Sequence, residues 1–563
     1  MIKRFNKATS LLVAAAAVSS LVPTAALAAD YKKVEAEEGT IYNAVAYNGA
    51  FVVDGNVVDE DTDAVYYLKD GKYTELEDVD SGAELKVYGQ KYVDIDDADQ
   101  YLDLTSGKLT DDDVEEDATD DAETTLRKKV KDVDRYDDNS ELPTLTALKG
   151  NKFAEVWYQT SSYTGFDVYT DEKGNYIDAD YNIGKIKVTN TSGDSVTLKN
   201  TKDTEKLDGI EVEASVSNKQ YLGQDSSNIY RLATITFKGE GAKIAKILGK
   251  EGNGDTIITS GDSASIEVIQ KISKAQASDD IDDAKYAKTV TNYVIADEDG
   301  KPDNKVKSFV ALAKHEDANF SVNNGKLVVS VFDEDNGVVI AQAATLKSKN
   351  GFYYIDAEDS SKEDAVAYDT DVNGNVYRLD SGYVYKFDNT DDWDKLYKVD
   401  GSMESLSVYD ANNMVVWSED DEVYSIVSGK SATNDEETTT ETTTGWVQNA
   451  DGTWNYLNAE GNKVVGWLQS AASGLWYYMD VNGSMMSNGW LNDRGTWYYL
   501  TETGAMKTGW LNDNGTWYYL QANGAMKTGW LNDNGTWYYL NASGAMLANT
   551  TVDGYVLGAN GAW

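Results

Sequence analysis

The sequence predicts a mainly β protein built from two unlike parts, a β-rich N-terminal body and a C-terminal β-hairpin solenoid. Three observations indicate this fold class. Residues 31–427 contain many short runs of alternating Val, Tyr, Ile and Thr between Asp, Gly and Asn turns. Residues 445–563 repeat a tryptophan motif with a period of 20 residues, and a Thr/Glu-rich stretch separates the two parts.

Composition narrows the possible chemistry. The 563 residues include 96 acidic and 50 basic side chains, one histidine and no cysteine, for a formal net charge of −46. Without cysteine there are no disulfides, cysteine nucleophiles or cysteine-ligated zinc, and one histidine excludes a multi-histidine metal site. So large an acidic excess disfavours nucleic acid and anionic membrane surfaces as partners.

Residues 1–28 have the pattern of a signal peptide. Lys3, Arg4 and Lys7 form a positive start, an apolar run covers 11–22, and Ala26-Leu27-Ala28 fits the small-x-small rule for cleavage. The apolar run is too short for a membrane helix, and no other long apolar stretch follows. We therefore expect a secreted, extracellular protein without a membrane span.

Residues 29–429 are predicted to form an acidic β-rich domain of unknown function. Period-2 strands are expected at 64–68, 375–379, 383–387, 415–417 and 422–426, and helices at 122–133, 242–248 and 264–277. A similar strand–turn–Gly pattern near both ends of the body suggests repeated antiparallel sheets. This favours a β-propeller whose first and last blades look alike, with tandem β-sandwiches as the alternative.

One turn of the body resembles the start of a calcium loop. Asp369, Asp371 and Asn373 match D-x-D-x-N-G, and Asp380 falls at the twelfth position. The same Asp-Val-Asn-Gly sequence occurs at 480–483 inside a repeat, where no calcium loop is expected. The sequence therefore favours a plain hairpin turn and no cofactor, with Ca²⁺ as the weaker alternative.

No catalytic residue can be assigned from the sequence. His315 is expected to be a lone surface histidine, and the acidic run at 111–117 a solvated loop. A glycosidase needs only two carboxylates with separated pKa values, so a carboxylate-dependent hydrolase stays open as an alternative.

Residues 430–444 are predicted to be a linker. The segment reads KSATNDEETTTETTT and has no apolar side chain larger than alanine. Such a composition cannot bury enough surface to offset the entropy lost on ordering.

The C-terminal region is a repeat array. Gly489, Gly509 and Gly529 each open the motif GWLND(R/N)GTWYYL, and looser copies begin at Gly445 and Gly466. A fixed short period indicates one supersecondary unit stacked on its copies, here a hairpin with Gly-Trp-Leu and Thr-Trp-Tyr-Tyr-Leu strands. The chain ends on a tryptophan where earlier copies have methionine, as expected of a capping repeat.

Strand alternation divides the repeat aromatics between two faces. Trp497 and Tyr499 share one face, and Tyr498 and Leu500 share the other. Asn455 replaces the middle aromatic in the first copy, so the tryptophan and the second tyrosine form the less dispensable pair. Clefts lined by such rings suit a quaternary ammonium group, at about 0.5–2 kcal/mol per ring. The alternative is that the rings only pack the solenoid.

By these motifs, residues 445–563 closely resemble the choline-binding, or cell-wall-binding, repeats of Gram-positive, clostridial-type surface proteins. The resemblance implies a β-hairpin solenoid that docks on phosphocholine of teichoic acids, although related repeats in large clostridial toxins bind glycans. It also implies sites made from the GW tryptophan, an aromatic of WYY, an aromatic of the next copy and sometimes a methionine. In this sequence those residues are Trp467, Trp490, Trp510 and Trp530; Trp476, Trp497, Trp517 and Trp537; Tyr478, Tyr499, Tyr519 and Tyr539; and Met506 and Met526.

The leading interpretation is an exported, non-catalytic surface protein. The repeats would hold it non-covalently on choline of teichoic acid or on a wall glycan and display the acidic β body. The alternatives are a carboxylate-dependent cell-wall or glycan hydrolase, and a glycan-binding adhesin or toxin-like module. The sequence leaves dimerisation through the repeats open.

Overall fold

The computed structural model describes residues 31–57, 62–97, 99–137, 144–160, 165–323, 325–428, 445–448, 454–457, 463–470, 475–480, 483–487, 489–493, 496–501, 503–513, 515–521, 523–533 and 535–563. The predicted signal peptide and linker lie outside these residues. Contacts divide the chain into two units, residues 1–434 and 435–563. No helix in the described part of the chain has the length and hydrophobicity needed to span a membrane.

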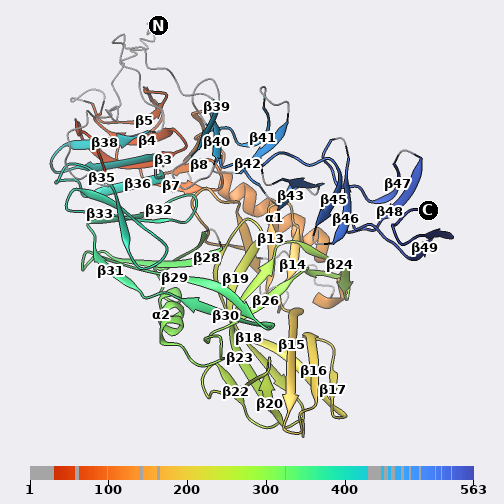
Figure 1. Cartoon of the computed structure of the whole chain (residues 1–563). Helices are drawn as coiled ribbons and strands as arrows, with labels where there is room; N and C mark the ends of the chain where they lie inside the picture. The colour runs from red at the N-terminus through yellow and green to blue at the C-terminus, as the bar shows by residue number, and fades with distance from the viewer. Residues whose placement is uncertain are drawn as a thin grey trace, which may run out of the picture. The chain divides into compact units, whose positions relative to one another are not determined.

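The body begins and ends with small antiparallel sheets that follow one another along the chain (Figure 1). The first is β3 (Ile41–Tyr47), β4 (Ala50–Gly55), β5 (Ala64–Lys69) and β6 (Lys72–Glu75), and the second is β7 (Leu85–Tyr88), β8 (Tyr92–Ile95), β9 (Gln100–Asp103) and β10 (Lys108–Thr110). Towards the end of the body come β32 (Ala367–Thr370), β33 (Val376–Asp380), β34 (Tyr383–Phe387) and β35 (Trp393–Lys398), then β36 (Ser405–Asp410), β37 (Asn413–Ser418) and β38 (Val423–Val427).

These sheets stack face to face, and the first packs on the last. One face of the first sheet, with Phe51 and Val53, buries against Val415 and Ile426 of the last sheet. Its other face contacts the second sheet. The N-terminal strands β1 (Lys32–Lys33) and β2 (Glu37–Glu38) pair with β35 and β38. Closure of the last sheet by an N-terminal strand is propeller-like, as the similar patterns at the two ends of the body predicted.

The middle of the body is a β-sandwich. One layer is β15 (Asn182–Asn190), β16 (Ser195–Asn200), β20 (Ile244–Ile247) and β21 (Lys250–Glu251). The other is built on β17 (Glu205–Leu207), β18 (Ile210–Gln224), β19 (Asn228–Lys238), β22 (Ile257–Thr259), β23 (Ser263–Ser273) and β26 (Val290–Val294). Alternate residues such as Ile186, Ile235 and Ile266 fill the space between the layers. This sandwich interrupts the blade pattern, so the propeller and sandwich alternatives each describe part of the body.

Two further groups of strands flank the sandwich. Before it, β11 (Thr146–Ala147), β12 (Trp157–Thr160), β13 (Val168–Asp171) and β14 (Tyr176–Asp178) continue through the parallel neighbour β25 (Ala284–Ala287) to β24 (Gln276–Ile281). After it, β27 (Asn319–Asn323), β28 (Lys326–Asp333), β29 (Val338–Lys349), β30 (Phe352–Ala357) and β31 (Ser361–Asp364) extend the large sheet. The β26–β30 pairing therefore joins the sandwich to the strands after it, whereas the strands before it form a separate sheet.

Helix prediction was largely wrong. The structure has α1 (Val114–Val130), the 3₁₀ turn at Asp134–Tyr136, and α2 (Asn304–Ala313). Asp113 caps α1 by accepting from the Glu116 N–H at 2.9 Å, so the acidic run is a helix start and not a loop. The segments 242–248 and 264–277 form β20 and β23, because Ile244, Ile247, Ile266 and Val268 pair and bury within the sandwich.

The C-terminal unit is a succession of two-stranded hairpins, as predicted. They are β39–β40 (Gly445–Gln448, Trp454–Leu457), β41–β42 (Gly466–Gln469, Trp476–Met479), β43–β44 (Gly489–Asp493, Thr496–Leu500), β45–β46 (Gly509–Asp513, Thr516–Leu520), β47–β48 (Gly529–Asp533, Thr536–Leu540) and β49–β50 (Thr550–Val552, Tyr555–Leu557). The last pair is a degenerate sixth hairpin that sequence reasoning did not identify.

Candidate functional site

The hairpin register assembles an aromatic face on each repeat. In β43–β44, Trp490 lies directly opposite Tyr499, and Asn492 lies opposite Trp497. Trp490, Trp497 and Tyr499 therefore share one face, as the alternation predicted. The Trp490 ring lies 5.3 Å from Tyr499 and 6.5 Å from Trp497, both edge-on, and Trp497 is 42% exposed.

The next repeat completes this face. Tyr518, the middle aromatic of the following WYY, lies 4.8 Å from the Trp490 ring at an interplanar angle of 67°. We call Trp490, Trp497, Tyr499 and Tyr518 an aromatic junction, because it joins two repeats. The equivalent tyrosine packs at 4.7–4.8 Å on Trp446, Trp467 and Trp510, and the terminal hairpin supplies Tyr555 at 5.4 Å from Trp530.

A carboxylate from the next repeat holds four of the five GW tryptophans in place. The Trp490 indole Nε1 donates to Asp513 Oδ2 at 2.9 Å. The same bond joins Trp467 to Asp493, Trp510 to Asp533 and Trp530 to Asp553, at 2.9–3.1 Å. These four junctions therefore combine aromatic rings with a negative charge, a combination that suits a quaternary ammonium group.

Backbone hydrogen bonds set the spacing between hairpins. The Met526 N–H donates to the Trp497 carbonyl at 2.8 Å, and the Met506 and Met546 N–H groups bond equivalently to Trp476 and Trp517. At the chain end the Trp563 N–H donates to the Trp537 carbonyl at 2.9 Å. The final tryptophan therefore takes the methionine's place in the capping repeat, as its position predicted.

The methionine side chains have a packing partner within the solenoid. A Cβ added to Gly524 would lie only 2.2 Å from the Met506 sulfur. A Cβ added to Gly544 would lie 2.3 Å from the Met526 sulfur. Each glycine has a positive φ, +82° and +79°, so the turn needs glycine both for its backbone and for the methionine. The structure thus places these predicted floor residues on the turn of the next repeat.

The structure brings most predicted site residues together and adds others. Each GW tryptophan contacts the second tyrosine of its own WYY, at 5.2–5.3 Å for Trp467, Trp490, Trp510 and Trp530. Trp476, Trp497, Trp517 and Trp537 are 38–42% exposed at the rim. The residues missed from the sequence are the middle tyrosines Tyr477, Tyr498, Tyr518 and Tyr538, Tyr555, and the aspartates Asp493, Asp513, Asp533 and Asp553. Their signal was the recurrence of WYY in four copies and of the motif aspartate in the last three, whereas Asp553 and Tyr555 lie outside the motif.

The first copy has the same ring contacts as the others, but Ser470 stands where the later repeats have the aspartate that binds the tryptophan. Trp446 lies 5.2 Å from Tyr456 and 4.7 Å from Tyr477. Since the middle aromatic serves the preceding repeat, Asn455 in the first copy has no upstream tryptophan to contact. The substitution therefore reflects position in the array and not a lesser role for the middle tyrosine.

The calcium-like turn of the body is a side-chain-bonded hairpin turn. The Asp371 carboxylate accepts the Asn373 and Asn375 N–H groups, the Asn375 side-chain amide and the Tyr377 hydroxyl, at 2.7–3.0 Å. Asp369 pairs with Lys152 and accepts the Val408 N–H at 2.7 Å. Asp380 ends β33 beyond this turn. No cluster of three metal-ligating side chains occurs among the described residues.

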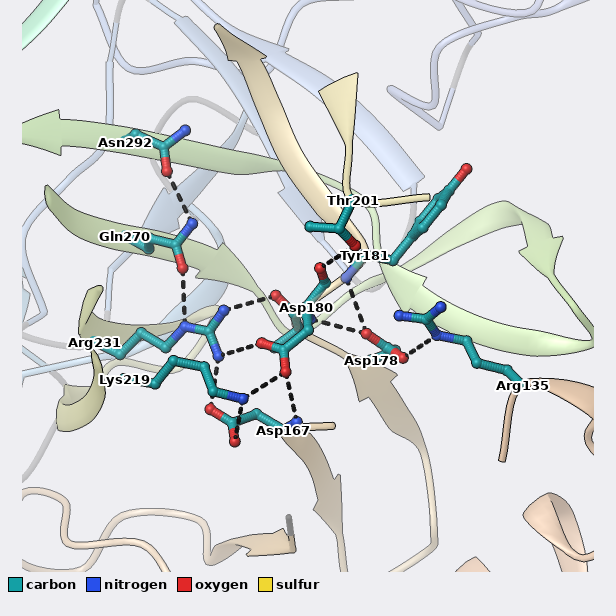
Figure 2. Close-up of polar contacts among 11 residues, drawn as sticks. Arg135, Asp167, Asp178, Asp180, Tyr181, Thr201, Lys219, Arg231, Gln270 and Asn292 are labelled. Carbon is teal, nitrogen blue, oxygen red and sulfur yellow. Dashed lines mark hydrogen bonds and ion pairs between the residues drawn. The ribbon is translucent and has the colours of Figure 1, made fainter. Parts of the chain in front are cut away.

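Two groups of body carboxylates bear on the hydrolase alternative. Asp167 and Asp180 are buried and bound by Arg231, at 2.7 and 2.9 Å, and by Lys219 (Figure 2). Although burial opposes ionisation, the charges of Arg231 and Lys219 lower the pKa of Asp180, so Asp167 and Asp180 belong to a structural ion network.

Glu155 and Glu172 line a 270 Å³ cavity, where burial and then the charge of Glu155 raise the pKa of Glu172.

His315 lies at the surface, as the sequence analysis predicted. The His315 side chain is 49% exposed and lies 3.6 Å from Asp317 on the turn after α2. It contributes to neither group of carboxylates.

Comparison with known proteins identifies the repeats. A choline-binding repeat model matches residues 507–550, and a putative cell wall binding repeat model matches residues 465–485 and 488–506. No curated protein matches the chain.

Solved structures from Streptococcus pneumoniae are similar over part of the chain. CbpJ is 29% identical over 42% of this chain and 76% of its own, with a TM-score of 0.21. Choline binding protein F, solved with a peptidoglycan analogue, is 27% identical over 42% and 75%, with a TM-score of 0.21. The choline binding domain of Spr1274 is 35% identical over 16% of this chain and 99% of its own, with a TM-score of 0.14. The C-terminal repeats of this chain therefore belong to the choline-binding, cell-wall-binding repeat family.

Proposed function

We propose that this is an exported, non-catalytic surface protein whose aromatic junctions bind choline on teichoic acid and whose acidic β body is displayed from the wall. The repeat family implies non-covalent wall binding through choline or a wall glycan. The recurrence of one junction geometry from Trp446 to Trp530 supports choline as the ligand. The four junctions from Trp467 to Trp530 also offer a nearby carboxylate, which together with the ring faces favours a cation over a neutral sugar.

Release from purified walls tests the ligand. The full chain is bound to walls and then washed with millimolar choline or with neutral wall saccharides. We expect choline to release it and the saccharides to leave it bound. Release by saccharides alone would support the glycan-binding adhesin instead. Walls are preferable to a diethylaminoethyl resin, because a chain of charge −46 binds such a resin by ion exchange.

Junction variants separate recognition from non-specific adsorption. The triple change W490A/W510A/W530A removes the central ring of three junctions and should abolish most wall binding. Y42A is the control, since Tyr42 is an aromatic residue of the body that is 36% exposed. Equal wall binding by the triple variant and Y42A would contradict the proposal.

The cavity with Glu155 and Glu172 gives the hydrolase alternative a specific form. Two carboxylates whose pKa values are pushed apart are the requirement of a glycosidase acid–base pair. Wall turbidity measured with the wild type and E172Q decides between the two functions. We expect neither to clear walls, whereas clearing by the wild type that is lost in E172Q would establish the hydrolase.

A further inference from the structure

A basic groove is lined by residues on or next to β15, β16 and the strands β24 to β26, whose positions Figure 1 shows. Two cavities of 490 and 670 Å³ both include Asn182, Lys199 and Lys288 in their lining, so they adjoin. Lys185 lines the first cavity beside them. Among the described residues, no Asp or Glu lines either cavity.

The charge of this groove is opposite to that of the chain. Acidic residues outnumber basic ones by 96 to 50 overall, yet the groove presents three lysines. Within the described residues, the ammonium groups of Lys185, Lys199 and Lys288 form no ion pair. Two carboxylates lie beside the second cavity: Asp203 accepts from Asn200 of its lining at 2.9 Å, and Asp282 pairs with Lys202 at 2.5 Å. The lining itself presents three lysines and no carboxylate.

The uncharged lining fits a polyhydroxylated chain. Tyr181 and Tyr286 lie edge to face, with ring centroids 4.7 Å apart, and Tyr353 is 41% exposed at the other end of the groove. Ring faces of this kind stack on sugar rings, while Ser278 supplies a side-chain hydroxyl that can hydrogen-bond to sugar hydroxyls.

A buried network fixes the groove floor (Figure 2). Asp178 accepts the Tyr181 N–H at 3.0 Å, and the Thr201 hydroxyl donates to the Asp180 carbonyl at 2.8 Å. From Arg231 the network runs through Gln270 to Asn292, whose amide donates to the Ile183 carbonyl at 2.7 Å. Tyr181, Asn182 and Asn292 are thus held in place without a ligand, which lowers the entropy lost on binding.

We propose that this groove binds a segment of an anionic saccharide polymer, whose phosphate or carboxylate groups contact Lys185, Lys199 and Lys288 and whose polyol or sugar units lie along the tyrosines. The site belongs to the body and is independent of the choline junctions. It gives the displayed domain a ligand of its own.

Titration calorimetry on the full chain in saturating choline tests the groove, because choline occupies the junctions. The probes are an oligo(glycerol phosphate), an oligogalacturonate and a neutral maltooligosaccharide of similar length. We expect one or both anionic probes to bind and the neutral probe not to bind. The two anionic arms distinguish phosphate from carboxylate as the recognised group.

Charge variants decide whether the groove is the site. K185Q/K199Q/K288Q should weaken anionic-probe binding by about tenfold or more, since three charge contacts are lost. K72Q/K108Q/K238Q is the matched control, with the same charge change at exposed lysines outside the groove.

Three results would overturn the groove proposal. They are no binding of either anionic probe to the wild type, equal binding of the neutral probe, and equal weakening by the two triple variants. Choline release of both variants from walls reports separately on the junctions, so failure of one proposal is distinguishable from failure of the other.

Discussion

Tyr518 belongs to one repeat by sequence and to the previous junction by contact, with its ring 4.8 Å from Trp490. We expect Y518A to weaken choline binding at that junction about tenfold, because one ring of the site is lost. Calorimetry should then show one fewer strong site per chain. Y42A, in the body, should leave the stoichiometry unchanged, and an unaltered stoichiometry in Y518A would exclude the middle tyrosine from the site.

Gly524 tests how the repeats are held together. Its φ is +82°, and a Cβ there would approach the Met506 sulfur to 2.2 Å. Gly515 has a similar φ of +88° but nothing within 4 Å of an added Cβ. Both alanine variants cost about 1 kcal/mol for the left-handed backbone, and G524A should cost about 1 kcal/mol more for displacing the methionine. Thermal unfolding followed by tryptophan fluorescence reports on this, since 11 of 14 tryptophans lie in the repeats. Equal losses would mean that the Met–Gly contact is not stabilising.

At the scale of elements, Arg231 on β19 joins the sandwich to the β13–β14 hairpin. It is fully buried against Asp167 and Asp180. R231M leaves two buried carboxylates with only Lys219, so we expect a loss of about 3–5 kcal/mol in the free energy of unfolding. K305M is the control, because Lys305 and Asp359 form an exposed pair at 2.7 Å worth at most about 1 kcal/mol.

The pH dependence of unfolding gives the same network a second test. In the wild type the pKa of Asp180 is lowered, so Asp180 contributes stability above its unfolded pKa that is lost as the pH falls through the folded one. Without the Arg231 charge, burial raises this pKa, and R231M should lose stability as the pH rises. Parallel pH profiles for wild type and R231M, measured by urea unfolding, would show that Arg231 does not set this pKa.

The alternation of apolar and polar residues predicted individual strands well. It did not predict which strands, distant in sequence, pair with one another. The strands at 64–68 and 383–387 follow directly from period-2 apolar residues, as found in β5 and β34. The segment 264–277 contains good helix formers, but β23 is fixed by pairing with β19 and β26, which no local pattern reveals. Arg231 was likewise unpredictable, since its partner Asp167 is 64 residues away. The repeat junctions were largely predictable because each is formed by neighbours in sequence, but the roles of the middle tyrosines and of the aspartates required the structure.

For the whole molecule, most of the charge and most of the tryptophan lie in different units. Residues 445–563 hold eight acidic and four basic side chains, −4, which leaves −42 of the total −46 for residues 1–444. An anionic wall polymer therefore repels the body, while the nearly neutral repeats recognise their ligand through short-range ring contacts. The repeats must bind against this repulsion.

This separation predicts how salt acts on wall binding. Raising NaCl from about 0.1 to about 1 M shortens the Debye length from about 10 to about 3 Å, which screens the repulsion and leaves ring contacts intact. Wall affinity of the full chain, measured by co-sedimentation, should therefore hold or rise with salt, and choline should still release it. Any contribution from the basic groove would fall with salt, so K185Q/K199Q/K288Q should show the rise most clearly. If salt alone releases that variant, then ionic attraction holds the protein to the wall, and the aromatic junctions do not.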